Sequence, residues 1–237
     1  MEIVEVNCPR SINLKDSKDD DIDSIRQTID IYDSVVMHQE IKKTTGIVIN
    51  TSDNLKEEFN DQVKKIIHIF EQYVGIIVRD LIIEIKDDPN QLLFDENNIL
   101  SGIIVALNNY FKCNLSNHEL IYLSQKINQV ISYYLQGGYK KILKDGKIKN
   151  IANNPYQKYF LIDSYDYSKE DLIKIKNIIG NKDGIDYFEY NYDFPFIALK
   201  ENIATVLSIY LKKEFSKMQI HSCKNTFGNK VLIKYLK

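Results

Sequence analysis

The stretch that decides the fold lies at residues 24–33 and reads Ser24-Ile25-Arg26-Gln27-Thr28-Ile29-Asp30-Ile31-Tyr32-Asp33. Segments typical of strands lie on both sides of it. Residues 2–6 alternate polar and apolar side chains, as a half-buried strand does. Residues 34–38 and 46–50 are predicted as two further short strands. Residues 15–23, which include five aspartates, are predicted as an exposed loop.

Helical periodicity begins after this group of strands. Apolar residues recur every three or four positions over 54–73, which predicts an amphipathic helix that ends at Gly75. Residues 76–85 are rich in β-branched side chains and are predicted as a buried strand. Residues 98–110 predict a mostly apolar, central helix. A third helix is predicted over 116–131, because Ser116 and Glu119 have the spacing of a capping box.

The pattern restarts after Pro155. A turn at Gly137-Gly138 and a strand pair around 140–151 come before it. The second part is predicted as a strand, two helices and two closing strands, at 159–164, 168–179, 196–215, 218–221 and 231–235. This order predicts α+β architecture with two domains, residues 1–154 and residues 155–237.

Composition excludes several classes of function. The 237 residues carry a formal net charge of -2, which gives no electrostatic basis for binding nucleic acid or an anionic membrane. The three cysteines form no CxxC pair and the four histidines lack metal-ligand spacing, so we expect no metal. The N-terminus has no apolar stretch long enough for a signal peptide, so we expect a cytoplasmic protein.

Four motifs, in order along the chain, resemble one family of enzymes. Residues 24–33 fit the pattern S-x-x-Q-x-I-D-L-Y-D, and residues 8–14 fit a P-A-K-I-N-L strand. Residues 106–120 fit A-L-N…L-S…E-L, and residues 133–138 fit F-F-L-x-G-G. The chain thereby resembles 4-diphosphocytidyl-2-C-methyl-D-erythritol kinase, a GHMP-superfamily enzyme of non-mevalonate isoprenoid precursor synthesis.

The resemblance implies a fold and a set of ligands. It implies a domain similar to ribosomal protein S5 domain 2 over residues 1–154 and a ferredoxin-like domain over residues 155–237. It also implies ATP and magnesium as cofactors, if the chain is active.

The resemblance further implies that the ATP loop is degenerate here. The family motif G-G-G-S-S-D-A-A falls on residues 94–101, which contain no glycine. Asp95 and Glu96 put two negative charges where the triphosphate would lie, and Asn97 and Asn98 follow them. Carboxylates at that place also suit a structural role, because they stabilise a helix N-terminus.

The positions that correspond to the family's catalytic residues are also changed. Its aspartate falls on Val130, which cannot accept a proton, and its lysine falls on Ser11. Arg10 is adjacent to Ser11 but is expected to point to the opposite face of the strand. The family's G-Y-H hairpin falls on residues 15–23, which have no Tyr or His. The late S-G-S-G motif falls on residues 222–225 and has lost both glycines.

These losses favour a non-catalytic pseudokinase that needs no cofactor and binds a protein partner or a small-molecule ligand. A divergent but active kinase that phosphorylates CDP-methylerythritol through other residues is the alternative. A structural protein unrelated to kinases is the third class. A homodimer is left open.

Overall fold

The structure is a computed structural model of the chain. It describes residues 3–13, 22–39, 46–50, 57–86, 95–151, 158–163, 196–200, 219–224 and 232–236.

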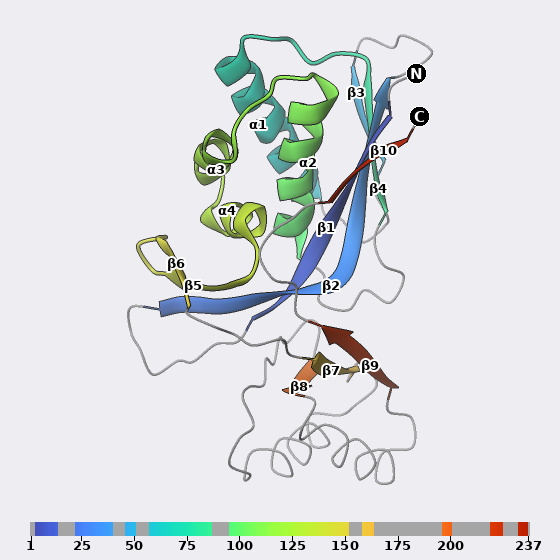
Figure 1. Cartoon of the computed structure of the whole chain (residues 1–237). Coiled ribbons are helices and arrows are strands. Elements are labelled where there is room, and N and C mark those ends of the chain that lie inside the picture. Colours follow the sequence, from blue (N-terminus) through green and yellow to red (C-terminus); the bar gives the residue numbers. More distant parts are fainter. Residues whose placement is uncertain are drawn as a thin grey trace. The chain divides into compact units, whose positions relative to one another are not determined.

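The described residues form ten strands and four helices (Figure 1). In chain order these are β1 (Ile3–Asn13), β2 (Ile22–Gln39), β3 (Ile47–Asn50), α1 (Glu57–Val74), β4 (Leu81–Lys86), α2 (Glu96–Tyr110), α3 (Asn117–Gln125), α4 (Gln129–Gln136), β5 (Tyr139–Leu143), β6 (Ile148–Asn150), β7 (Lys158–Asp163), β8 (Phe196–Lys200), β9 (Gln219–Lys224) and β10 (Leu232–Leu236).

The chain divides into two compact units, each assembled from separated segments. One comprises Met1–Arg10, Ile31–Gly137 and Gly228–Lys237, and the other comprises Ser11–Asp30 and Gly138–Phe227. Strands β1 and β2 therefore contribute residues to both units. The predicted boundary between residues 154 and 155 lies outside the described residues and stays a prediction.

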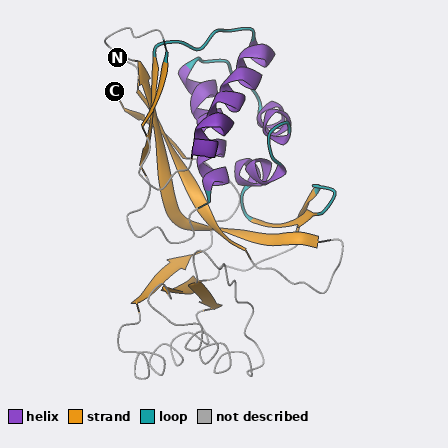
Figure 2. Ribbon diagram, turned by 180° about the vertical axis from the view of Figure 1, so that it is seen from behind, coloured by secondary structure: helices purple, strands orange, loops and turns teal. Residues whose placement is uncertain are grey.

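The first unit consists of a sheet with all four helices on one face (Figures 1 and 2). The strand order is β10-β1-β2-β4-β3. Strand β1 pairs antiparallel with β10, so the first and last strands of the chain lie side by side. Strand β4 pairs antiparallel with β2 and parallel with β3. The sheet thus presents one face to the helices and positions the start of α2 over β1 and β2.

Helix α2 is the centre of this unit because nearly every side chain on it is buried, from Asn98 to Asn108. It lies close to β1 at Gly102, where an added Cβ would overlap the Cys8 sulfur and lie 3.2 Å from Val35 Cγ2. Helix α1 buries one stripe of side chains at helical spacing, namely Phe59, Val63, Ile66, Ile67 and Phe70. Each such side chain stabilises the fold by about 1.5–3 kcal/mol.

The second unit contains the first half of β2. Residues Ile22–Gln27 of this strand pair antiparallel with β5, and β6 returns along β5. Two hydrogen bonds connect Thr28 with Gly138. The Thr28 N–H donates to the Gly138 carbonyl (3.2 Å), and the Gly138 N–H donates to Thr28 Oγ1 (2.8 Å). Strands β8, β7 and β9 form a separate antiparallel sheet in that order.

Several predicted elements are confirmed. The strands predicted at 2–6, 46–50 and 159–164 match β1, β3 and β7, and those predicted at 218–221 and 231–235 match β9 and β10. The strand pair at 140–151 matches β5 and β6. Gly75 ends α1 with φ 77°, and both hydrogen bonds of the predicted capping box at Ser116 and Glu119 are present.

Four predicted elements need correction. The strand predicted at 76–85 begins only at Leu81, because Asp80 has a positive φ of 54° and pairing with β3 starts there. The helix predicted at 116–131 is two helices, since Asn128 takes an extended conformation and caps α4. Residues 196–200 of a predicted helix form β8, which pairs with β7. Finally, β2 is one long strand that starts at Ile22, inside the predicted loop.

The other predicted elements fall partly or wholly outside the described residues. These are the rest of the loop at 15–21, the helix at 168–179 and the remainder of the helix at 196–215. Among the described helices, none combines the length and the apolar composition needed to cross a membrane.

Candidate functional site

The start of helix α2 carries residues 95–101, where the sequence resemblance predicts the family's nucleotide loop. Asp95 caps the helix in an extended conformation, with φ -140° and ψ 112°. Its carboxylate accepts a hydrogen bond from the Asn97 N–H (3.0 Å), and its carbonyl accepts one from the Asn98 N–H (3.1 Å). Glu96 adds a second carboxylate in the first turn. The positive end of the helix is therefore matched by the chain's own negative charge.

Helix α4 holds the Asp95 carboxylate from a second direction. The hydroxyl of Tyr134, a fully buried residue, donates to Asp95 Oδ2 (2.8 Å). The side-chain amide of Asn97 donates to the other oxygen, Asp95 Oδ1 (2.7 Å). Hydrogen bonds to an ionised acceptor are stronger than those between neutral groups. Together with the Asn97 N–H, these donors fix the carboxylate at the start of the helix.

The first turns of α2 and α4 are also joined by two asparagines. The Asn128 amide donates to Asn97 Oδ1 (3.1 Å), while Asn128 Oδ1 accepts from the Val130 N–H (2.9 Å) and caps α4. Val130 therefore lies in the first turn of α4 as a half-buried apolar residue. The structure thus brings Asp95, Asn97 and Val130 to one place, and the apolar Val130 adds no acid or base there.

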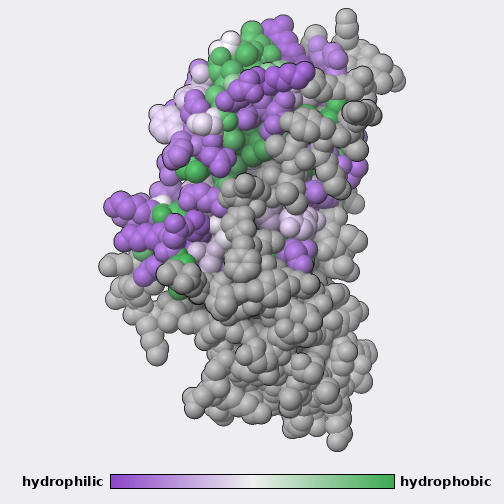
Figure 3. All heavy atoms as spheres, in the orientation of Figure 1, coloured by the Kyte–Doolittle hydropathy of each residue, from purple (hydrophilic) through white to green (hydrophobic). Residues whose placement is uncertain are grey.

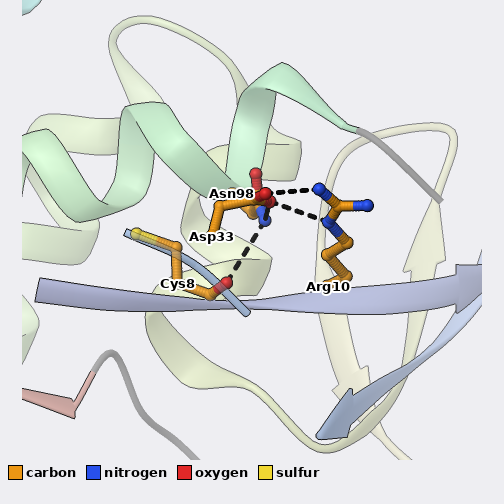
Figure 4. A network of polar contacts seen from close by, with 4 residues as sticks. All are labelled: Cys8, Arg10, Asp33 and Asn98. Atoms are coloured by element: carbon orange, nitrogen blue, oxygen red, sulfur yellow. Dashed lines mark hydrogen bonds and ion pairs between the residues drawn. The ribbon is translucent and has the colours of Figure 1, made fainter. Parts of the chain in front are cut away.

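Asn98 points into the interior and meets a buried ion pair (Figure 4). Its amide donates to Asp33 Oδ2 (2.7 Å) and to the carbonyl of Cys8 (3.4 Å). Arg10 Nε donates to the same Asp33 oxygen (2.9 Å), and a second guanidinium nitrogen donates to Asp33 Oδ1. Asn98, Asp33, Arg10 and Cys8 are all 0% exposed.

This network ties the first turn of α2 to strands β1 and β2. A buried charge left without its partner costs about 3–5 kcal/mol, so Arg10 and Asp33 depend on each other. From the sequence, Arg10 is noticed only as a poor substitute for the family's lysine, and Asp33 has no predicted role. The two residues are 23 positions apart. The pair could have been predicted from the sequence, because Arg10 and Asp33 have opposite charges and both occupy core-facing positions of their strands.

Cys8 is a structural thiol in this setting. Burial raises the pKa of its side chain well above the ordinary value, and the negative charge of Asp33 raises the pKa further. The thiolate is the nucleophilic form of cysteine, so Cys8 stays protonated and unreactive.

Ser11 lies outside the Arg10–Asp33 network and has its own hydrogen-bond partner. It is buried in β1, and its hydroxyl accepts a hydrogen bond from Arg26 (3.4 Å). Of the four residues on which the late S-G-S-G motif is predicted to fall, residues 222–224 belong to β9 and residue 225 is not described. Of the eight residues on which the ATP loop is predicted to fall, residue 94 is not described. His68, on α1, is exposed.

The chemistry at the start of α2 is that of a closed structural junction. Its described contacts join carboxylates, amides and a phenol, and the cation among them, Arg10, is neutralised by Asp33. Within the described ranges, no group of three or more His, Cys, Asp or Glu side chains is placed to hold a metal ion. The arrangement is suited to holding helices in place, because Asp95, Asn97 and Asn98 each bond to other described residues.

Known proteins match this chain by structure and not by sequence. No protein-family model matches the chain. No curated protein matches it by sequence.

Solved structures match over nearly the whole chain. Homoserine kinase from Cytophaga hutchinsonii is 12% identical with a TM-score of 0.67, over 100% of this chain and 98% of that one. Mevalonate pyrophosphate decarboxylase from Streptococcus pyogenes is 12% identical with a TM-score of 0.72, over 97% and 98%. The Methanococcus jannaschii mevalonate kinase is 14% identical with a TM-score of 0.61, over 94% and 98%. The chain therefore has the α+β fold of the GHMP kinase superfamily, as predicted.

Proposed function

We propose that this chain is a non-catalytic member of the GHMP kinase fold, a pseudokinase homologous to 4-diphosphocytidyl-2-C-methyl-D-erythritol kinase. In this proposal it binds neither ATP nor magnesium productively and acts through a protein partner or a small-molecule ligand. A location in the cytoplasm belongs to the same proposal.

One observation carries the proposal. The Asp95 carboxylate lies at the N-terminus of α2 and is held there by the Tyr134 hydroxyl (2.8 Å) and the Asn97 N–H (3.0 Å). A GHMP kinase needs these helix donors for phosphate oxygens. A phosphate about 4 Å from such a carboxylate meets a repulsion on the order of 4 kcal/mol at an effective dielectric of about 20. Glu96 adds to it from the same turn.

ATP with magnesium is the ligand pair that the fold suggests. A mevalonate diphosphate decarboxylase of this fold has been solved with AMPPCP and magnesium. The described residues of this chain do not fit that pair. Asp95 and Glu96 are negative where phosphates need donors, Val130 cannot act as a base, and the Ser11 hydroxyl is no cation.

The test is a phosphoryl-transfer assay with Mg-ATP and CDP-methylerythritol, followed by phosphorus NMR at a stoichiometric protein concentration. We expect no ADP and no phosphorylated product. Product formation at one equivalent or more would replace the proposal with the alternative, a divergent active kinase for CDP-methylerythritol.

A matched variant tests the role of the first turn directly. Asp95→Ser keeps a capping oxygen and removes the charge, so the helix start is retained. We expect this variant to remain folded and to bind Mg-ATP more tightly than the natural chain does. If Asp95→Ser and the natural chain bind Mg-ATP equally well, the carboxylate is not what closes the site.

A further inference from the structure

The hairpin formed by β5 and β6 is strongly basic. Residues 139–150 contain five lysines and one acidic residue, Asp145, whereas the whole chain has a formal net charge of -2. Lys144, Lys147 and Lys149 are exposed. In the orientation of Figure 1, the described surface of this hairpin is mostly hydrophilic (Figure 3). We propose that β6 and its exposed lysines bind an extended, acidic segment of a partner protein, which adds to the hairpin as a further strand.

Two of the exposed lysines lie on one face of the hairpin. Ile142 on β5 is 2% exposed and is the direct partner of Ile148 on β6, so their face turns inward. Successive side chains of a strand point to opposite faces, and Lys149 therefore lies on the outward face. The pairing continues to Lys147, whose carbonyl accepts a hydrogen bond from the Leu143 N–H (2.9 Å). Lys147 thus shares the outward face with Lys149.

The described contacts leave this face short of negative charge. Asp145 forms an ion pair with Lys147 (2.6 Å). Hydrogen bonds from Lys147, with the nearby charges of Lys147 and Lys149, hold the pKa of Asp145 below its usual value. Lys149 lies directly across from Lys141, and like charges at such positions destabilise a sheet. Because Lys141 has further interactions within the chain, an added carboxylate belongs beside the exposed Lys149.

Strand β6 also has an outer edge that a further strand could join. Among the described strands it pairs with β5 alone. In an antiparallel pair, alternate residues direct their N–H and C=O groups toward the partner strand. The Ile151 N–H donates to the Tyr139 carbonyl (3.3 Å), so the odd-numbered residues of this stretch face β5. The N–H and C=O groups of Ile148 and Asn150 therefore point to the outer edge.

The edge and the lysine face together select the partner. An added strand forms main-chain hydrogen bonds with the outer edge of β6, and its alternate side chains lie beside Lys147 and Lys149. Lysine is a compact charge that pairs with a carboxylate without the forked geometry of arginine. A polyanion such as nucleic acid is disfavoured, because the chain as a whole carries a net negative charge. The partner is therefore a protein segment with acidic residues at alternate positions.

This inference goes beyond the proposed pseudokinase function. The hairpin and the start of α2 belong to different compact units. Strand addition at β6 needs neither a nucleotide nor its absence. The failure of either proposal would leave the other standing.

The test is a titration of a fluorescently labelled synthetic peptide, in which glutamate alternates with threonine, with the full chain. Fluorescence anisotropy measures binding. The control peptide has the same composition, with its glutamates in one block and its threonines in another. We expect saturable binding of the alternating peptide, tighter than that of the block peptide. Binding should weaken at higher salt, because exposed charges are screened.

Charge variants test the lysine face. The double variant Lys147→Gln and Lys149→Gln should weaken binding about tenfold, which is about threefold for each exposed ion pair lost. The matched control is the double variant Lys64→Gln and Lys65→Gln, which makes the same charge change at exposed lysines of α1. One of these also has an acidic neighbour, since Lys64 pairs with Asp61 (3.0 Å). This control should bind as the natural chain does.

A backbone variant tests strand addition. Asn150→Pro leaves the charge unchanged and removes an N–H from the outer edge, so binding should weaken about fivefold. The alternating peptide with N-methylated backbone amides removes donors from the peptide instead and should weaken binding in the same way, whether or not Asn150→Pro folds.

The proposal is overturned if the alternating peptide does not bind, or if it binds no better than the block peptide or its N-methylated form. It is also overturned if the two double lysine variants lose the same affinity. Tighter binding of a single-stranded oligonucleotide, or of vesicles that contain anionic lipid, would overturn it in favour of a general site for polyanions.

Discussion

The hydroxyl of Tyr134 donates a hydrogen bond of 2.8 Å to the carboxylate of Asp95, so a buried phenol on α4 holds a negative charge at the N-terminus of α2. In a kinase of this fold the same helix terminus would face phosphate. In the proposed pseudokinase, the Asp95 carboxylate takes the place of that external anion. The contact belongs to the first compact unit and is the main physical support for the proposal.

Tyr134→Phe should destabilise the fold by about 1.5–3 kcal/mol, because it removes a hydrogen bond to a charged acceptor and keeps the buried ring. Urea unfolding followed by circular dichroism measures the change. Tyr122→Phe is the control, since that side chain is 51% exposed and should change stability by less than about 0.5 kcal/mol. Equal effects of the two substitutions would mean that the hydroxyl of Tyr134 has no special role.

The buried pair of Arg10 and Asp33 should show strong coupling. Arg10→Met or Asp33→Leu alone leaves one buried charge unpaired and should cost about 3–5 kcal/mol. The double variant should cost clearly less than the sum of the two, because it removes both charges together. Chemical unfolding of the four proteins gives the coupling energy, and additive effects would contradict the pairing. If a single variant does not fold, recovery of folding in the double variant gives the same answer.

Substitution of Gly102 should destabilise the fold through a clash with Cys8, and shortening the Cys8 side chain should relieve that clash. Gly102→Ala places a methyl group against the Cys8 sulfur, and such overpacking costs about 1–3 kcal/mol. Cys8→Ala in the same chain removes that sulfur and should recover part of the loss. Thermal unfolding of the single and double variants measures this. A double variant less stable than both single variants would argue against a contact between the two positions.

The capping box of α3 makes stability depend on pH. Hydrogen bonds from the Ser116 hydroxyl, and then from its N–H, hold the pKa of Glu119 below its usual range. A carboxyl with a lowered folded-state pKa contributes stability above its unfolded pKa of about 4.3, and this contribution fades as pH falls through the folded value. The natural chain should therefore be more stable than Glu119→Gln at pH 7, and this advantage should shrink as the pH falls below about 4.3. A difference that does not change with pH would contradict this.

Helices and strands were predicted correctly from the sequence where neighbouring residues alone determine the structure. Helix α2 was predictable because a mostly apolar run of more than ten residues is too long for an ordinary strand. The break between α3 and α4 was missed because it contains no glycine or proline, although Asn128 is a residue type that favours caps. Residues 196–200 were misjudged because a short apolar run fits a helix or a strand equally well.

The loss of the family's functional groups at Asp95, Asn98 and Val130 stays a prediction, which rests on the spacing of the family motifs. The contacts that these residues make in the fold were not predicted. The partners that hold them were not found. Asp33 lies 65 residues from Asn98, and Tyr134 lies 39 residues from Asp95, so only the folded sheet and helices bring them together. No pattern in a single sequence encodes such pairs.

The most direct test of the account is calorimetric titration of the full chain with Mg-ATP, with an intact GHMP kinase titrated alongside as the positive control. The account predicts no saturable heat from this chain at millimolar nucleotide, because Asp95 already occupies the helix terminus. Saturable heat of the size seen for the control would contradict it and would mean that the site accepts phosphate despite the carboxylate.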